Sequence, residues 1–227
     1  MTVITNIEDL RVLAQKRVPR MFYDYVDTGS WTEGTYRANE DDFQKIKFRQ
    51  RVAINMENRT TRTQLVGQDV AMPVALAPVG STGMQCADGE ILAARAAGKF
   101  GVPFTLSTMS ICSIEDVAAN SPYPFWFQLY VMRDRAFIER LIERAKAAKC
   151  SALVLTLDLQ ILAQRHKDLK NGLSVPVKPT LASIANLLTK PSWCLAMAGT
   201  KRRQFGNIVG HVKGVDNIGS LSESTTR

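Results

Sequence analysis

Five polar side chains near the middle of the chain are of types that bind ligands, and each stands at or near the end of a short apolar run. They are Ser107, Gln128, Tyr130, Thr156 and Asp158. Their hydroxyl, amide, phenol and carboxylate groups can all hydrogen-bond a bound molecule. Short, continuously apolar runs are typical of parallel strands covered on both faces. Because ligands of parallel α/β proteins bind at the carboxyl ends of the strands, the pattern predicts a binding edge.

The elements that would position these side chains alternate along the sequence. Strands are expected at 74–78, 104–107, 126–130 and 153–158, with helices between them at 88–100, 114–119 and 135–149. Gly101 and Ser113 are typical helix stop and start residues. Each strand and helix together span roughly the ~30 residues of a βαβ unit, which indicates a parallel sheet. A closed barrel and an open doubly wound sheet both fit, although the chain lacks the G-x-G-x-x-G and Walker motifs common in open sheets.

The region before the first strand is expected to cap the sheet. Asn6 followed by Asp9 predicts the start of a helix that reaches toward Pro19. Further helices are expected at 21–27 and about 35–46, followed by a hairpin at 63–69. The predicted division is a helical cap and hairpin at 1–70, four strands with their helices at 71–160, and a basic, partly apolar loop and helical segment with a disordered tail at 161–227.

The composition is typical of a globular protein. The chain has 227 residues, 45% of them apolar and 22% charged, which suffices for one sizeable core. The sequence shows no signal peptide and no run near the ~18 apolar residues of a membrane-spanning helix, so a cytoplasmic location is expected. Four cysteines without Cys-x-x-Cys spacing predict reduced thiols, and with only two histidines to add we assign no metal site.

The net charge of +8 is concentrated after residue 160. No nucleic-acid-binding motif accompanies these cations, so a nucleic acid partner is not expected. The segment at 181–199 is apolar, is interrupted by Pro191, carries Trp193 and is flanked by cations. These features fit peripheral contact with the anionic inner face of the cell membrane. They fit a buried helical pair with solvated charged ends equally well.

Six ordered motifs resemble one enzyme family. They are YDYVDTG at 23–29, MPVALAPVG at 72–80, TLSTMS at 105–110, FQLYV at 127–131, LTLD at 155–158 and QRHKDLKNG at 164–172. In this order and at these separations they are similar to the FMN-dependent 2-hydroxy-acid dehydrogenases and oxidases, and most closely to the flavin-linked L-lactate dehydrogenases. The resemblance implies the N-terminal portion of a (β/α)8 TIM barrel, with about four βα units and an N-terminal helical cap.

The resemblance also implies where FMN would bind. In that family the flavin lies across the C-terminal ends of the strands. The loop of Ala77, Pro78, Val79 and Gly80 would lie against the flavin ring. Three polar side chains at strand ends would hydrogen-bond the flavin or its ribityl chain, namely Ser107, Gln128 and Thr156. Amide and hydroxyl groups suit the heteroatoms of a flavin.

The substrate side follows from the same resemblance. Tyr25 and Arg165 would bind the substrate carboxylate, and Tyr130 would lie near its hydroxyl carbon. Asp158 would pair with the catalytic histidine of the family. Neither His166 nor His211 lies in the Ser-Asn-His-Gly motif that carries this histidine. The lysine, histidine and arginine motifs of the second half of the family barrel do not occur in these residues.

The expected reaction is oxidation of an L-2-hydroxy acid, with L-lactate to pyruvate favoured, in which a hydride passes to FMN and electrons then pass to a quinone or a cytochrome. Family members are often homo-oligomers. Because the half that carries the base is missing from the sequence, a truncated chain without turnover is expected. Two alternatives remain: a non-catalytic half-barrel interaction module or split-gene subunit, and a basic membrane- or RNA-binding protein on an unrelated α/β fold.

Overall fold

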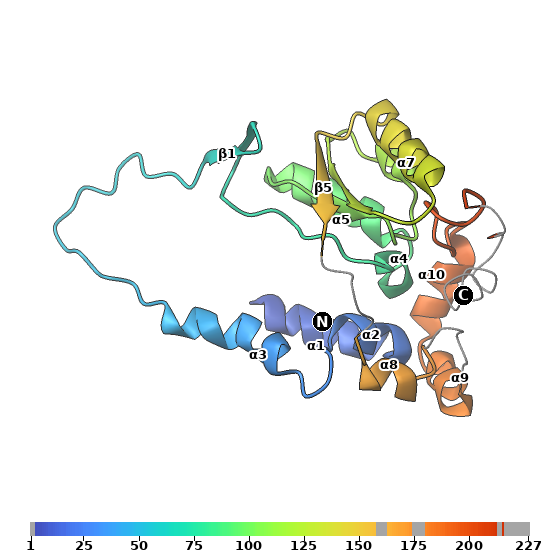
Figure 1. Cartoon of the computed structure of the whole chain (residues 1–227). Helices are drawn as coiled ribbons and strands as arrows, with labels where there is room; N and C mark the ends of the chain where they lie inside the picture. The colour runs from blue at the N-terminus through green and yellow to red at the C-terminus, as the bar shows by residue number, and fades with distance from the viewer. Residues whose placement is uncertain (1–2, 158–162, 174–179, 213–214, 216–227) are drawn as a thin grey trace.

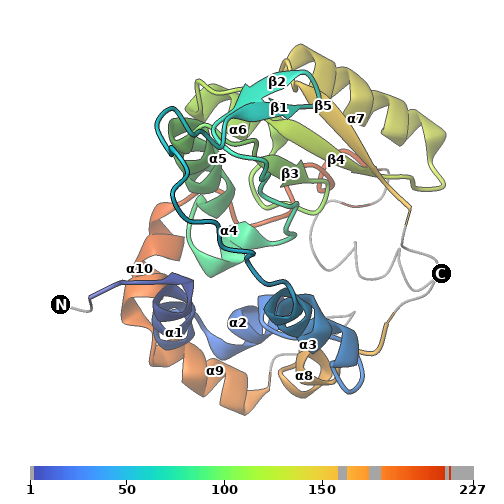
Figure 2. The same cartoon turned by 90° about the vertical axis from the view of Figure 1, so that its left-hand side faces the viewer.

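The computed structural model describes residues 3–157, 163–173, 180–212 and 215. It has two layers, seen edge-on in Figure 2. One layer holds the strands with α5 (Gly89–Phe100), α6 (Ile114–Asn120) and α7 (Arg135–Ala147). The other layer holds helices from both the N-terminal and the C-terminal regions (Figure 1). Helices from the two ends of the sequence therefore lie together beneath the sheet.

The N-terminal helices form where local capping signals predict them. Helix α1 (Ile7–Arg17) starts at a capping box, in which the Asn6 side chain accepts a hydrogen bond from the Asp9 amide at 2.9 Å and the Asp9 carboxylate accepts one from the Asn6 amide at 3.3 Å. It is followed by α2 (Arg20–Val26), α3 (Gly34–Asp41) and the 3₁₀ helix η1 (Asp42–Lys45). The predicted helices are confirmed.

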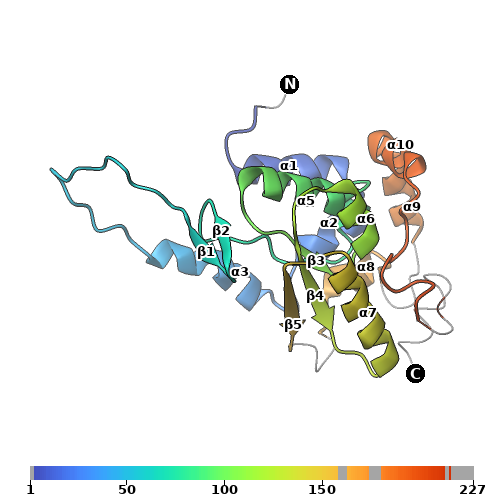
Figure 3. The ribbon, with the colours of Figure 1, turned by 90° about the horizontal axis from the view of Figure 1, so that it is seen from above.

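An extended segment at 46–62 runs away from the body and returns at the predicted hairpin, as Figure 3 shows from above. The hairpin consists of β1 (Thr63–Leu65) and β2 (Gln68–Val70), paired antiparallel. The indole nitrogen of Trp126 donates to the Gln68 side chain at 3.0 Å. Trp126 is the first residue of β4 (Trp126–Tyr130), so the hairpin contacts the N-terminal end of the sheet.

The main sheet is parallel, with the order β3 (Thr105–Ser107), β4 (Trp126–Tyr130) and β5 (Ala152–Thr156). The expected strand at 74–78 does not form. Leu76 makes a single parallel bridge to Phe104. Pro73 and Pro78 bracket the segment and have no amide hydrogen to donate, so a longer ladder cannot build on both sides of Leu76. The segment still lies beside β3.

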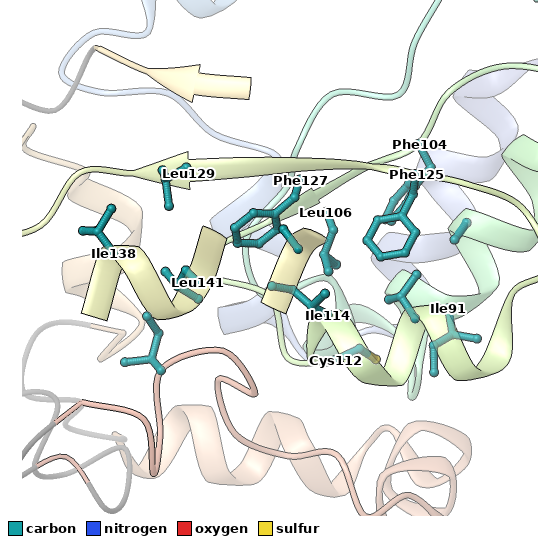
Figure 4. Packing of buried hydrophobic residues seen from close by; sticks show 14 of the residues in the cluster. Ile91, Phe104, Leu106, Cys112, Ile114, Phe125, Phe127, Leu129, Ile138 and Leu141 are labelled. Atoms are coloured by element: carbon teal, nitrogen blue, oxygen red, sulfur yellow. The ribbon is translucent and has the colours of Figure 1, made fainter. Parts of the chain in front are cut away.

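The two faces of the sheet differ in polarity, although β3 and the middle of β4 are buried on both faces, as expected. Phe127 and Leu129 of β4 and Leu106 of β3 point toward the helices, and each is at most 3% exposed. Figure 4 shows them packed against α6 and α7, next to Ile114 and Leu141. The residues between them on the strands face the other way and include polar groups. The core therefore lies between the sheet and α5–α7.

The outer strand β5 is incompletely covered. Leu153 pairs in register with Phe127 and Leu155 with Leu129, so the four side chains share the helix-facing side. Yet Leu153 is 47% exposed and Leu155 is 51% exposed. Within the described residues, β4 is the one strand paired with β5. An apolar strip thus remains at this edge of the sheet.

The C-terminal region contributes α8 (His166–Lys170), α9 (Leu181–Leu188) and α10 (Pro191–Gly199). The interpretation of α9 and α10 as a buried helical pair is wrong. Leu181, Leu188 and Leu195 are 87%, 77% and 75% exposed. No helix among the described residues is long and apolar enough to cross a membrane.

The four cysteines are free thiols. The predicted disordered tail, SESTTR at 222–227, lies outside the described residues.

Candidate active site

A chain of hydrogen bonds joins three strand ends on the face of the sheet that points away from the helices. The Ser107 hydroxyl donates to the Gln128 side-chain oxygen at 3.2 Å, and the Gln128 amide donates to the Thr156 hydroxyl at 2.7 Å. Gln128 is 1% exposed, and its oxygen also accepts from the Thr108 amide at 3.3 Å. These contacts fix the amide orientation. In the described part of the chain, the Thr156 hydroxyl hydrogen remains available for a ligand.

The loop that follows the Leu76 bridge offers exposed backbone beside this network. Ala77, Pro78 and Val79 are exposed, and the next residue, Gly80, is half-buried. A Cβ atom on Gly80 would lie 3.2 Å from the Tyr25 hydroxyl. Glycine therefore allows the tyrosine to approach the backbone closely. An exposed backbone strip with hydroxyl and amide groups nearby fits a flat heterocycle such as a flavin.

Tyr25 and Arg165 lie in contact, although 139 residues separate them in the sequence. The Arg165 guanidinium carbon is 4.9 Å from the centre of the Tyr25 ring. Its terminal nitrogen donates to the Tyr25 carbonyl oxygen, and its Nε donates to Asp168 Oδ2 at 2.6 Å. A phenol next to a guanidinium is a donor set that suits a carboxylate.

Burial affects the protonation of this group of residues. Burial raises the pKa of the Tyr25 phenol, and the Arg165 guanidinium opposes that shift. The phenol therefore stays protonated and can donate a hydrogen bond at neutral pH. Burial also raises the pKa of Asp168, although its hydrogen bond to Arg165 acts in the other direction. Asp168 Oδ1 is buried and has no partner within the described residues.

Two predicted site residues remain, Tyr130 and Asp158, and the structure describes only the first of them. Tyr130 ends β4, pairs in register with Thr156 and donates its backbone amide to the Thr108 hydroxyl at 3.3 Å. It thus lies at the same strand-end edge. Asp158, predicted to pair with the catalytic base, lies outside the described residues. The structure therefore brings together Ser107 with Gln128 and Thr156, and Tyr25 with Gly80 and Arg165.

Glu90 supports this site, although nothing in the sequence singles it out. Its Oε1 accepts hydrogen bonds from the Gly83 and Ile111 amides, both at 2.9 Å. The two amides belong to the segments that follow the 77–80 loop and strand β3. Glu90 is 1% exposed. Glu90 lies in the first turn of α5, where an acidic residue is also an ordinary helix-start signal, so the sequence does not reveal its buried hydrogen bonds.

Fold and site together define a class of protein. A parallel sheet with helices on one face and a polar edge at its strand ends belongs to the ligand-binding α/β proteins, here with part of a barrel. The family model described as FMN-dependent dehydrogenase matches residues 14–225, and the chain belongs to that family. FMN is the cofactor of the family, which confirms the expected cofactor. The polar and backbone groups described above fit it.

Two curated relatives illustrate the likeness. The L-lactate dehydrogenase of Pseudomonas syringae pv. syringae (strain B728a) is 42% identical over 91% of this chain and 54% of its own length. That of Stenotrophomonas maltophilia (strain R551-3) is 46% identical over 84% of this chain and 50% of its own length. The chain thus spans about half the length of the curated relatives it matches.

Solved structures agree with this assignment. A crystal structure of (S)-mandelate dehydrogenase, described as a monotopic membrane protein, superposes with a TM-score of 0.89 and 31% identity. The superposition covers 99% of this chain and 59% of the other. A soluble mutant of the membrane-associated (S)-mandelate dehydrogenase from Pseudomonas putida gives a TM-score of 0.72 at 36% identity, over 80% of this chain and 52% of that one. The partial-barrel part of the fold prediction is confirmed.

Proposed function

We propose that this chain supplies the flavin rim and part of the substrate site for FMN-dependent oxidation of an L-2-hydroxy acid, with L-lactate to pyruvate as the reaction. The observation that carries the proposal is the chain of hydrogen bonds from Ser107 through Gln128 to Thr156. It presents fixed hydroxyl and amide groups at the carboxyl edge of a parallel sheet. The L-lactate dehydrogenases among the relatives support the choice of substrate.

FMN, when bound, supplies a two-electron acceptor for the substrate. Ser107, Gln128 and Thr156 would hydrogen-bond it, and the backbone of Ala77, Pro78, Val79 and Gly80 would lie against its ring. Because the Gln128 amide is held on both sides, its polar atoms need no reorientation when the cofactor enters. The 77–80 loop contributes exposed backbone rather than a charged group.

The Tyr25 phenol and the Arg165 guanidinium would bind the substrate carboxylate. Asp168 holds Arg165 by a 2.6 Å hydrogen bond, which limits the positions of the guanidinium before substrate arrives. Tyr130 would contact the substrate near its hydroxyl carbon. Asp158 would stabilise the charged form of a histidine base that lies in the part of the relatives this chain does not span. Turnover by these residues alone is therefore not expected.

Several partners belong to the same proposal. Electrons would leave for a quinone or a cytochrome, and the complete enzyme would be a homo-oligomer. The exposed leucines of α9 and α10 would contact the inner face of the cell membrane peripherally. The mandelate dehydrogenase described as monotopic supports that contact. The three regions 1–70, 71–160 and 161–227 would then correspond to cap, strand-bearing half barrel and membrane-contacting segment.

Complementation tests the proposed reaction. The chain is co-expressed with the part of the Pseudomonas syringae relative that lies outside the matched stretch, and the visible spectrum of the purified pair is recorded. We expect a flavin band that L-lactate bleaches, and no bleaching with the chain alone. Gln128→Leu should weaken FMN binding by roughly tenfold, whereas Gln64→Leu on the hairpin should not. A pair that binds FMN but is bleached by no 2-hydroxy acid overturns the proposal.

A second candidate function rests on the exposed edge of β5. Leu153 and Leu155 would suit an apolar partner chain, so the half barrel could act as a non-catalytic interaction module or split-gene subunit. The same co-expression distinguishes the two. A stable pair that contains no flavin favours the interaction module, and flavin reduction favours the enzyme.

A further inference from the structure

An apolar groove lies between α1 and α10, on the layer opposite the sheet. Its volume is about 350 Å³. Leu10, Leu13 and Ala14 of α1 form one wall, and Trp193 and Ala196 of α10 form the other. A groove of this size is in the range of small-molecule sites. Its apolar walls suit a hydrocarbon chain rather than a polar metabolite.

The Trp193 wall is held in place before any ligand binds. The indole nitrogen donates to the Met84 carbonyl oxygen at 2.9 Å. The ring stacks on Phe22 with centroids 5.4 Å apart and an interplanar angle of 24°. Because both contacts fix the indole, the side chain cannot easily swing to fill the groove. The cavity is therefore preformed, which lowers the entropic cost of binding.

A basic pocket adjoins the groove, and Val18 lines both. Arg20, Lys167 and Lys190 line this second pocket together with a single carboxylate, Asp24. The Arg20 side chain is 74% exposed and its ion pair with Asp24 is 3.4 Å long, so it is weakly held. Lys190 donates to the Lys16 carbonyl oxygen at the C-terminal end of α1, at 2.6 Å.

Two further groups affect the charge balance. Lys167 lies 3.6 Å from Glu33, with half of its side chain exposed, so this pair is also weak. Arg17, in the last turn of α1, lines the apolar groove. The junction of groove and pocket thus has an excess of cations next to an apolar channel. That combination complements an amphiphile with a negative head and a hydrocarbon tail.

We propose that α1, α2, α8, α9 and α10 form a specific site for one anionic phospholipid, with an acyl chain in the groove beside Trp193 and the phosphate near Arg20, Lys167 and Lys190. The inference rests on the proposed membrane contact and deepens it, because a held lipid differs from a surface that merely touches the bilayer. Leu10 and Leu195 are 50% and 75% exposed, so the groove lies close to side chains that could enter the headgroup region.

The test uses the whole 227-residue chain and dioleoyl phosphatidylglycerol. Native mass spectrometry measures whether one lipid stays bound, and co-sedimentation with vesicles of phosphatidylglycerol or phosphatidylcholine measures membrane contact. Ala14→Trp would fill the groove, whereas Val12→Trp places the same ring on α1 outside the groove. We expect Ala14→Trp to weaken retention of the single lipid by roughly tenfold and Val12→Trp by less than about twofold.

A second comparison tests the contribution of the cations. It uses Lys190→Glu, with Lys99→Glu on α5 as the control outside the pocket. Lys190→Glu should reduce retention of phosphatidylglycerol but not the small retention of phosphatidylcholine, and Lys99→Glu should change neither. Inorganic phosphate at millimolar concentration should not displace the lipid. Displacement by phosphate would reduce the site to an anion site and overturn the proposal.

Other outcomes separate this inference from the membrane proposal. If the unmodified chain sediments with anionic vesicles and Ala14→Trp retains one lipid as well as the parent does, the lipid site is wrong and the membrane contact stands. If the unmodified chain does not sediment with vesicles at all, the membrane contact fails. A chain that holds no lipid but self-associates through α1 and α10 likewise overturns the lipid site in favour of a protein interface.

Discussion

The helix-facing side of the sheet and the surface of α9 and α10 are both apolar. Leucine occurs in both regions, with phenylalanine in the first and tryptophan in the second, yet the exposed fraction of these side chains differs. Leu106 and Phe127 are fully buried, whereas Leu188 and Leu195 are more than 70% exposed. Apolar composition alone therefore does not define a core. The sheet side chains are buried because neighbouring strands and crossover helices surround them, while α9 and α10 rest on other elements by one side only.

The largest expected difference between the two regions is in stability. Phe127→Ala should lower the free energy of unfolding by about 3–5 kcal/mol, because it leaves a cavity between β4 and α7. Denaturant unfolding monitored by circular dichroism measures this loss. A loss below about 1 kcal/mol would show that the sheet side is not the core.

The next largest effect is expected at Glu90. Glu90→Ala leaves the buried Gly83 and Ile111 amides without their acceptor, so we expect a loss of at least about 2 kcal/mol in the free energy of unfolding. Glu90→Gln keeps an acceptor oxygen and should lose less. The same denaturation assay compares the two variants. Equal losses of stability in Glu90→Ala and Glu90→Gln would mean that the hydrogen bonds from the Gly83 and Ile111 amides do not hold their two segments in place.

A smaller, pH-dependent effect is expected where α6 meets α7. The Arg144 guanidinium holds both oxygens of Glu115 at 2.7 Å and lowers the pKa of that carboxyl to about 2. Because the folded-state pKa lies below the ordinary value of 4.5, the stabilisation is complete above pH 4.5 and is lost as the pH falls toward 2. The side chain is half exposed, so the loss is at most about 1 kcal/mol.

Glu115→Gln checks this pH dependence. The variant should be less stable than the parent at pH 7, and the difference should shrink as the pH is lowered from 4.5 toward 2. Stability measured by urea unfolding at several pH values gives the comparison. A constant difference across the whole range would contradict the assigned direction.

The smallest effect on stability is expected in α9. Leu188→Gln should change the free energy of unfolding by less than about 0.5 kcal/mol, because the side chain is already exposed. The same change should lower sedimentation with anionic vesicles. A large loss of stability without any loss of vesicle binding would place Leu188 in a buried contact and remove the contrast between the two regions.

Local signals predicted much of the fold. The bounds of β4 agree with the predicted strand at 126–130, and the capping boxes at Asn6 and Ser113 start helices where the sequence places them. These predictions depend on neighbouring residues only. The prediction of a strand at 74–78 was wrong, because apolar composition does not reveal how many backbone amides and carbonyls of a segment find a hydrogen-bond partner in the neighbouring strand. The exposure of α9 and α10 was undecided for the same reason, since it depends on what packs against them.

The site was predictable where motifs carry it and not where it depends on distant contacts. Ser107, Gln128 and Thr156 share one face because strand register aligns them, and the family motifs indicated all three. Asp168 and Glu90 were missed because their roles arise from buried hydrogen bonds to other segments. Charged residues within helices look like ordinary surface residues until the packing is known.

The extended segment at 46–62 has a consequence for the covalent integrity of the chain. Several basic residues stand in this arm, namely Lys47, Arg49, Arg51, Arg59 and Arg62. Exposed extended backbone is a preferred substrate for proteases. Trypsin should therefore cut here first, yet Asn171 donates to Asp24 at 2.6 Å and Gln85 to the Phe22 carbonyl at 2.8 Å, joining the two fragments. A nicked protein would keep its shape as two chains, so the covalent link through the arm is dispensable for the assembled fold.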